Sequence, residues 1–108
     1  MTTILLKYDD EYSRISIKDI IYVESDSHRL KIYVKDRIYY DNRTLINMLE
    51  ELLEHGFVRI HRSYIINLEY LTKIKGDNIE LNHSVWIKVG RYYKEDFIRV
   101  YKEALLIW

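Results

Sequence analysis

The sequence predicts a mainly β fold with two helices. Apolar and polar residues alternate with a period of two in several short segments, most clearly over 30–35 and 85–89. This period is typical of strands with one buried face. The chain also has 11 tyrosines and many isoleucines and valines, residue types that suit the pleated surface of a sheet. Two segments, near 44–54 and 91–106, have helical periodicity instead.

The strands are expected to be short and joined as hairpins. Turn-forming residues separate the apolar segments, at 9–11, 25–27, 35–36 and 76–78. The 108 residues contain no proline and no glycine- or serine-rich linker. A chain of this length matches the commonest size of one domain. We therefore interpret residues 1–108 as a single domain.

The two predicted helices have different surfaces. The first has apolar residues at i, i+3, i+4 and i+7, namely Leu45, Met48, Leu49 and Leu52. Thr44 can cap its start and Gly56 its end. Its outer face carries Glu50, Glu51 and Glu54, which would repel phosphates. The second helix has one apolar stripe that is expected to pack on the sheets, made of Phe97, Val100, Tyr101, Ala104 and Leu105.

Charge is segregated along the chain, although the formal net charge is zero. Residues 28–43, 57–75 and 88–102 each have a net charge of +3, whereas residues 1–27 and 44–54 are each −3. Binding to DNA phosphates requires lysine and arginine. The three basic segments could form one basic face on a neutral molecule, or they could be scattered over its surface.

The sequence contains no motif for catalysis or metal binding. Cysteine is absent, and the four histidines, at 28, 55, 61 and 83, lack the spacing of a zinc site. No nucleotide-binding glycine motif, nucleophile elbow or paired-carboxylate spacing is present. We therefore expect no enzyme activity, catalytic residue, metal or cofactor. The chain also lacks a signal peptide and an apolar run of about 18 residues, so we expect a cytoplasmic location without membrane insertion.

The segment 57–67, FVRIHRSYIIN, is the most distinctive in the chain. It reads as a strand that exposes Arg59 and His61 on one side, breaks at Arg62 and Ser63, and then resumes. An arginine at such a corner can present its planar guanidinium to guanine or to phosphate, and the serine hydroxyl can bond a phosphate oxygen. An ordinary surface arginine would give the same pattern.

This segment, extended to FVRIHRSYIINLEYLTKI, resembles the central signature of the LytTR family, the DNA-binding output domains of bacterial response regulators in two-component systems. Three other segments resemble the family in the right order: IIYVESDSHRLKIYV, TLINMLEELLE and WIKVGRYYKEDF. The resemblance covers nearly the whole chain. The central segment is specific, whereas the others would be weak evidence alone.

The resemblance implies about ten short strands in three small sheets with two helices. It also implies sequence-specific binding of double-stranded DNA for transcription regulation, by loops inserted into successive major grooves of a bent duplex. Carried over by position, the base-reaching candidates are His28, Arg62 and Arg91, each in a different basic segment. The candidates for holding the DNA backbone are Arg29, Ser63 and Lys94.

Each base-reaching candidate has a structural alternative. His28 could cap a hairpin turn, and Arg91 could be a surface charge at a helix start, although a cation there opposes the helix dipole. Gly90 stands where family members usually have serine, which removes one hydroxyl from that turn.

Other polar residues of the signature are interpreted as structural. We expect His61 and Asn67 to hold the strand break through hydrogen bonds. Tyr22, Tyr33 and Tyr64 are expected to be core residues rather than a platform for stacking bases.

The partners implied by the resemblance are direct repeats in DNA, a second copy bound weakly on the DNA, and a receiver domain, a sensor domain or an inhibitory membrane protein. The chain could be a stand-alone regulator or part of a longer one. A competing hypothesis is a protein-interaction module, because tyrosine is enriched at interfaces and the net charge is zero. Binding to DNA would weaken steeply with salt, whereas a tyrosine-rich protein interface would respond much less.

Overall fold

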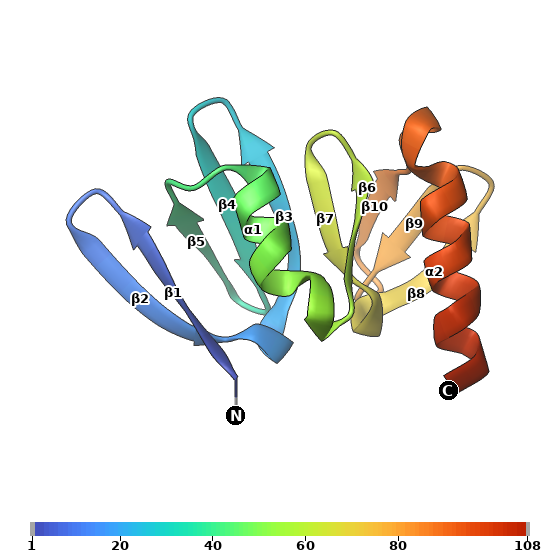
Figure 1. Cartoon of the computed structure of the whole chain (residues 1–108), viewed down its shortest axis with the longest axis horizontal. Coiled ribbons are helices and arrows are strands. Elements are labelled where there is room, and N and C mark those ends of the chain that lie inside the picture. Colours follow the sequence, from blue (N-terminus) through green and yellow to red (C-terminus); the bar gives the residue numbers. More distant parts are fainter. Residues whose placement is uncertain (1, 108) are drawn as a thin grey trace.

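Ten strands form three antiparallel sheets, and two α-helices pack beside them (Figure 1). In this computed structural model residues 2–107 are described, with side chains through Glu103. Over these residues the predicted mainly β fold, with ten strands and two helices, is confirmed. The expected positions of Ala104 and Leu105 on the second helix's apolar stripe fall on side chains outside the described residues.

The largest sheet has the strand order β5-β4-β3-β7-β6. Its strands are β3 (Ile20–Asp26), β4 (Arg29–Val34), β5 (Arg37–Asp41), β6 (Phe57–His61) and β7 (Tyr64–Asn67). β3 and β4 form one hairpin, β6 and β7 form another, and β7 pairs with β3 to join them. Because β3 and β7 are antiparallel, the end of β3 and the start of β7 lie at the same end of the sheet.

Two smaller sheets flank this central sheet (Figure 1). One is the hairpin of β1 (Thr3–Tyr8) and β2 (Glu11–Ser16). The other has the order β10-β9-β8 and consists of β8 (Leu71–Lys75), β9 (Asn78–Leu81) and β10 (Val85–Lys88). Short 3-10 helices connect the sheets, namely η1 (Ile17–Asp19) before β3 and η3 (Leu68–Tyr70) after β7.

The two helical segments match those predicted. Helix α1 (Leu45–Leu52) continues into η2 (Leu53–His55), and η4 (Arg91–Tyr93) leads into α2 (Lys94–Ile107). Thr44 caps α1 as expected, because its hydroxyl oxygen accepts the Asn47 N–H at 3.1 Å. The segment ends at Gly56, whose φ of 84° lies in the left-handed region that glycine adopts without strain.

The middle of the central sheet, at β3 and β7, is buried on both faces. Neighbouring residues of one strand point to opposite sides, yet Ile65 and Ile66 are both fully buried. Ile65 faces a core cluster with β1 and α1, whereas Ile66 faces a second cluster with β9, β10 and the start of α2. A strand covered on both faces needs a continuous apolar run. This explains IIYV in β3 and YII in β7, where the alternation seen in β4 is absent.

A buried carboxylate joins the first hairpin to the central sheet. Asp41, at the end of β5, is 1% exposed, and its Oδ1 accepts the Lys7 N–H of β1 at 2.8 Å. Its Oδ2 accepts from Arg43 Nε at 2.6 Å, and the same guanidinium donates to the Leu5 carbonyl at 2.7 Å. The charged pair therefore satisfies backbone groups of β1 that have no strand partner on this side.

Replacing Asp41 with alanine is expected to lower the free energy of unfolding by about 1.5 to 3 kcal/mol, the range for hydrogen bonds to charged groups. The change removes the acceptor for Lys7 N–H and leaves Arg43 without its carboxylate. Urea unfolding of the parent and the Asp41→Ala variant measures the difference. Asp36→Ala, at an exposed turn position, is the control. Equal stability of the two variants would contradict the bridging role of Asp41.

Candidate functional site

Three turns line up along one edge of the molecule (Figure 1). They are the β3–β4 turn at residues 27–28, the β6–β7 turn at residues 62–63, and the segment 89–93 that leads from β10 into α2. Backbone hydrogen bonds join neighbours in this row: Ser25 N–H donates to the Ser63 carbonyl at 2.8 Å, and Gly90 N–H donates to the Ile60 carbonyl at 2.7 Å. We call this row the turn edge. It brings together all three basic segments of the sequence.

The β3–β4 turn presents His28 and holds Arg29 back. Ser27 has a φ of 53°, and His28 is exposed, without a hydrogen bond or ion pair to the part of the chain that the structure describes. Arg29 instead lies 4.2 Å from the ring centre of Tyr40, and its Nη1 donates to the Tyr8 hydroxyl at 3.3 Å. The carboxylate of Asp26 is 3.7 Å from its Nε. Arg29 therefore fixes the turn against the first hairpin.

The β6–β7 turn is braced from within by two side chains that the sequence analysis expected on the exposed side of the strand. Arg59 donates to the carbonyls of His61 and Arg62, at 3.2 and 2.6 Å. His61 Nδ1 accepts the Ser63 N–H at 3.0 Å. Both residues are half-buried beside the segment 89–93, which places Tyr93 near Arg59 and Gly90 near His61. Arg62 is exposed, and its side chain makes no hydrogen bond or ion pair with other described residues.

The third turn packs closely on the second. A Cβ on Gly90 would lie 3.2 Å from Tyr93 Cδ2 and 3.5 Å from His61 Cδ2. A side chain here would crowd the Tyr93 ring, whereas its distance from His61 would be an ordinary van der Waals contact. Arg91 follows, exposed, with its Nη2 donating to the Tyr92 hydroxyl at 3.1 Å.

Two further residues, one in this turn and one directly after it, have surroundings that the sequence did not indicate. Tyr92 was not among the predicted site residues, yet it is 85% exposed beside Arg91. The sequence signal that could have identified Tyr92 is an aromatic residue within the basic segment GRYYK. Lys94 is not free: its Nζ lies 2.6 Å from Asp77 Oδ1 in the β8–β9 turn, and this ammonium lowers the pKa of the Asp77 carboxyl.

Tyrosines beneath the turn edge stack on one another and form hydrogen bonds within the domain. Tyr22 is buried and stacks on Tyr33 with ring centres 4.1 Å apart. The hydroxyls of Tyr33 and Tyr64 both donate to the Glu24 carboxylate, at 2.8 and 3.1 Å. Burial, together with the neighbouring Glu24, raises the pKa of each of these two tyrosines. The two phenols therefore stay neutral and hold β3, β4 and β7 together through one carboxylate.

Asn67 has a different position from the one expected. Its side-chain amide donates to the Ile20 carbonyl at 2.9 Å, and its oxygen accepts the Glu69 N–H at 3.0 Å. These bonds join the end of β7 to the start of β3, at the opposite end of the central sheet from the strand break. Of the two residues assigned to the break, His61 holds it and Asn67 does not.

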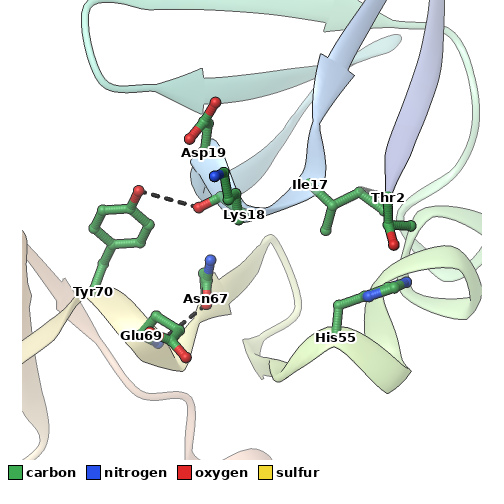
Figure 2. Close-up of a pocket in the computed structure, with 8 residues that line it drawn as sticks. All are labelled: Thr2, Ile17, Lys18, Asp19, His55, Asn67, Glu69 and Tyr70. Carbon is green, nitrogen blue, oxygen red and sulfur yellow. Dashed lines mark hydrogen bonds between the residues drawn. The ribbon is translucent and has the colours of Figure 1, made fainter.

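A large hollow lies at that opposite end, between η1, η2 and η3 (Figure 2). Asn67 and Tyr70 in its lining are used in structural hydrogen bonds, such as the one from the Tyr70 hydroxyl to the Lys18 carbonyl at 3.1 Å. No group of three histidine, aspartate or glutamate side chains within the described part of the chain is arranged to hold a metal ion. Neither described helix is long and apolar enough to cross a membrane. The turn edge is therefore the candidate site.

Comparison with known proteins identifies the same family that the sequence resembles. A family model described as the LytTr DNA-binding domain matches residues 10–102. Sensory transduction protein LytT of Bacillus subtilis is 31% identical over 61 residues, which cover 56% of this chain and 25% of that protein. Heme-containing CO-sensing transcriptional regulator RcoM 2 of Paraburkholderia xenovorans is 32% identical over 71 residues, covering 66% of this chain and 25% of that protein.

A solved structure has the same fold. It is the LytTr DNA-binding domain of a putative methyl-accepting/DNA response regulator from Bacillus cereus. It superposes with a TM-score of 0.79 at 19% identity, covering 93% of this chain and 96% of that one. The curated relatives are longer, since the matched region is about a quarter of their length.

Replacing His61 with alanine is expected to loosen the β6–β7 turn. Amide exchange at Ser63 should accelerate by a factor on the order of 2 to 12, which corresponds to about 0.5 to 1.5 kcal/mol of hydrogen-bond strength. His61→Asn should restore protection, because the asparagine Oδ1 can occupy the place of Nδ1 as acceptor. The Asn42 amide, bonded to the Lys7 carbonyl elsewhere, is the internal control. Unchanged exchange at Ser63 in His61→Ala would refute this role.

Proposed function

The chain belongs to the family of LytTR DNA-binding domains, and on that premise we propose that it reads specific sequences in double-stranded DNA as the output domain of a transcription regulator. The observation that carries this proposal is the turn edge. Three turns joined by backbone hydrogen bonds carry His28, Arg62 and Arg91, all exposed, in one row. In the proposed complex these turns enter successive major grooves on one side of the duplex.

The dimensions of the domain support this mode of binding. The turn edge runs along the longest axis of the molecule (Figure 1), which extends 41 Å. One turn of B-DNA rises by about 34 Å. The domain as a whole is therefore long enough to lie along one full turn of the duplex, with the turns facing the DNA. The turns are also narrow enough to enter a groove about 12 Å wide.

The exposed side chains suit base reading. Arginine can donate two hydrogen bonds to guanine O6 and N7, which is the commonest specific contact in the major groove. Arg62 is the best placed, because Arg59 and His61 hold its backbone while its own guanidinium has no partner among the described residues. We assign base reading to His28, Arg62 and Arg91. Tyr92, beside Arg91, is a further candidate for contact with the groove.

The three backbone-holding candidates have different local environments. Ser63 lies directly at the turn, where its hydroxyl can bond a phosphate oxygen. Arg29 and Lys94 are each paired with a carboxylate, Asp26 and Asp77 respectively. To contact a phosphate, each of these two cations must either share its carboxylate partner with the phosphate or leave that carboxylate. We therefore expect each of these two residues to contribute less to affinity than an unpaired cation would.

The competing interaction-module hypothesis loses its main support. It was motivated by tyrosines on exposed strands, but among the 11 tyrosines just Tyr12 and Tyr92 are exposed. Tyr22 is buried and the other eight are half-buried, two of them with hydroxyls that donate to Glu24. The tyrosine content is therefore explained by the interior of the domain.

The curated relatives that contain this domain are longer than the present chain. Relatives such as RcoM 2 are transcriptional regulators of which this domain matches about a quarter. We propose a cytoplasmic regulator whose receiver or sensor domain, or inhibitory membrane protein, controls the DNA-binding domain. One set of turns reads few bases, so two copies associating weakly on direct repeats would supply the specificity that a genome demands.

Selection from a random duplex library by the purified domain tests the function. We expect enrichment of a repeated motif at low salt, with weaker but still specific enrichment near physiological salt, because phosphate contacts weaken as salt rises. Circular dichroism would establish that the protein used is folded. A folded domain that enriches no motif at either salt would refute sequence-specific binding by this chain alone.

Replacing Arg62 with alanine should cost about 1 to 3 kcal/mol on the selected site and relax specificity at one position. A phosphate contact would instead lower affinity for all sequences alike. Fluorescence anisotropy with the selected duplex and single-base variants distinguishes the two. Arg14→Ala, which removes an exposed arginine of β2 away from the turn edge, is the matched control. Parent-like binding by Arg62→Ala would remove this residue from the site.

A further inference from the structure

The outer face of the β8–β9–β10 sheet carries a basic surface that the turn edge does not include. Residues directly opposite each other in a sheet lie on the same face. The register therefore gives two rows across the three strands, Lys75–Asn78–Lys88 and Lys73–Glu80–Trp86. The opposite face of the sheet carries Ile79 and Ile87, which are buried in the second core cluster. We call the outer surface formed by the two rows the lysine face.

The lysines of this face have no ion-pair partner within the described part of the chain, although, besides Lys94, the charge of Lys88 helps to lower the pKa of the Asp77 carboxyl. Lys73, Lys75 and Lys88 are exposed and form no ion pair with any residue whose side chain is described. Lys75 and Lys88 are separated by Asn78, about two strand spacings or roughly 10 Å apart. Nearby carboxylates are engaged elsewhere. Glu80 is buried and accepts from the Thr72 hydroxyl at 2.8 Å, while Asp77 is paired with Lys94.

An exposed tryptophan stands in the same surface. Trp86 lies on β10, an edge strand, and is 47% exposed. Together with Lys75, Asn78 and Lys88 it lines a shallow hollow. An indole ring offers a flat apolar surface and one N–H donor, which suits a ligand that is partly apolar and partly polar. A deoxyribose joined to phosphates has this character.

The lysine face adjoins the turn edge. β10 continues through Val89 directly into Gly90, and Val89 N–H donates to the Asp77 carbonyl at 2.8 Å. The Lys94–Asp77 pair crosses the same junction at 2.6 Å. The row of Lys75 and Lys88 is therefore nearer to the turn edge, and the row of Lys73 and Trp86 lies further from it. Positive charge thus continues from the turn edge around the end of the domain.

We propose that the lysine face binds the sugar–phosphate backbone of the duplex that flanks the site read by the turn edge. This inference rests on the proposed function and extends its footprint on one side. Lysine is a point charge without the fork of arginine that reads guanine, so the contact is with the backbone and independent of sequence. Continuity with the turn edge favours flanking DNA over an acidic protein as the partner.

Duplex length provides the test. The selected site is prepared as a minimal duplex and as duplexes extended by about ten base pairs on either side, roughly one turn. The parent should bind one extended duplex more tightly than the minimal one. With two added phosphate contacts the salt slope should steepen by about 1.8, so the advantage should shrink about tenfold between 50 and 200 mM salt. The Lys75→Gln/Lys88→Gln variant should lose this advantage and keep its affinity for the minimal duplex.

A matched control variant has the same charge change at the other end of the domain. Lys18 and Lys35 are exposed near the start of β3 and the end of β4, away from the turn edge. Lys18→Gln/Lys35→Gln should retain the advantage of the extended duplex. As a second measurement, in a Trp108→Phe background, fluorescence of Trp86 should change more on binding the extended duplex than the minimal one.

Each outcome separates this inference from the proposed function. If the parent binds the minimal duplex specifically but gains nothing from extension on either side, the lysine face has another partner, and the proposed function stands. A gain that survives in the Lys75→Gln/Lys88→Gln variant would also overturn the inference. Failure of the parent to bind any duplex specifically would instead refute the proposed function.

Discussion

Burial of β3 on both faces is the constraint on which the rest of the structure depends. A central strand covered from two sides must have its backbone groups hydrogen-bonded, and β4 and β7 supply these partners along most of β3. It must also have two separate layers above and below, which the first hairpin with α1 and the last sheet with α2 provide. The turns at the end of β3 and the start of β7 are therefore held side by side by the core itself.

Rigidity of the turn edge comes from charged residues that are used internally. Arg59 occupies the carbonyls of the β6–β7 turn, and Arg29 is held by Tyr8, Tyr40 and Asp26. Each ties down a main-chain segment that would otherwise be free to move. The conformational entropy of the binding loop is then lost when the domain folds, and little more is lost when it binds DNA. Arg62, supported in this way, can present a guanidinium without first having to order its own backbone.

The zero net charge has a physical interpretation in this arrangement. Cations beside the turn edge are partly neutralised by Asp26 and Asp77, while the acidic residues of α1 lie on another surface. Nonspecific affinity for DNA grows with the number of phosphate contacts. Pairing of Arg29 and Lys94 with carboxylates limits this background beside the turns and gives more weight to the contacts of the turns with bases. Charge distribution therefore says more about the function than net charge does.

The sequence by itself determined the strands, the two helices and the family, because periodicity, capping residues such as Thr44, and the segment 57–67 are local properties. It also singled out Arg62 and the three basic segments. The tertiary structure alone decided which cations are free. Lys94 pairs with Asp77 of another element, and Arg59 and His61 bond to the backbone of the β6–β7 turn rather than facing solvent freely. No local pattern encodes these, because burial and hydrogen-bond partners are set by the packing of segments distant in the chain.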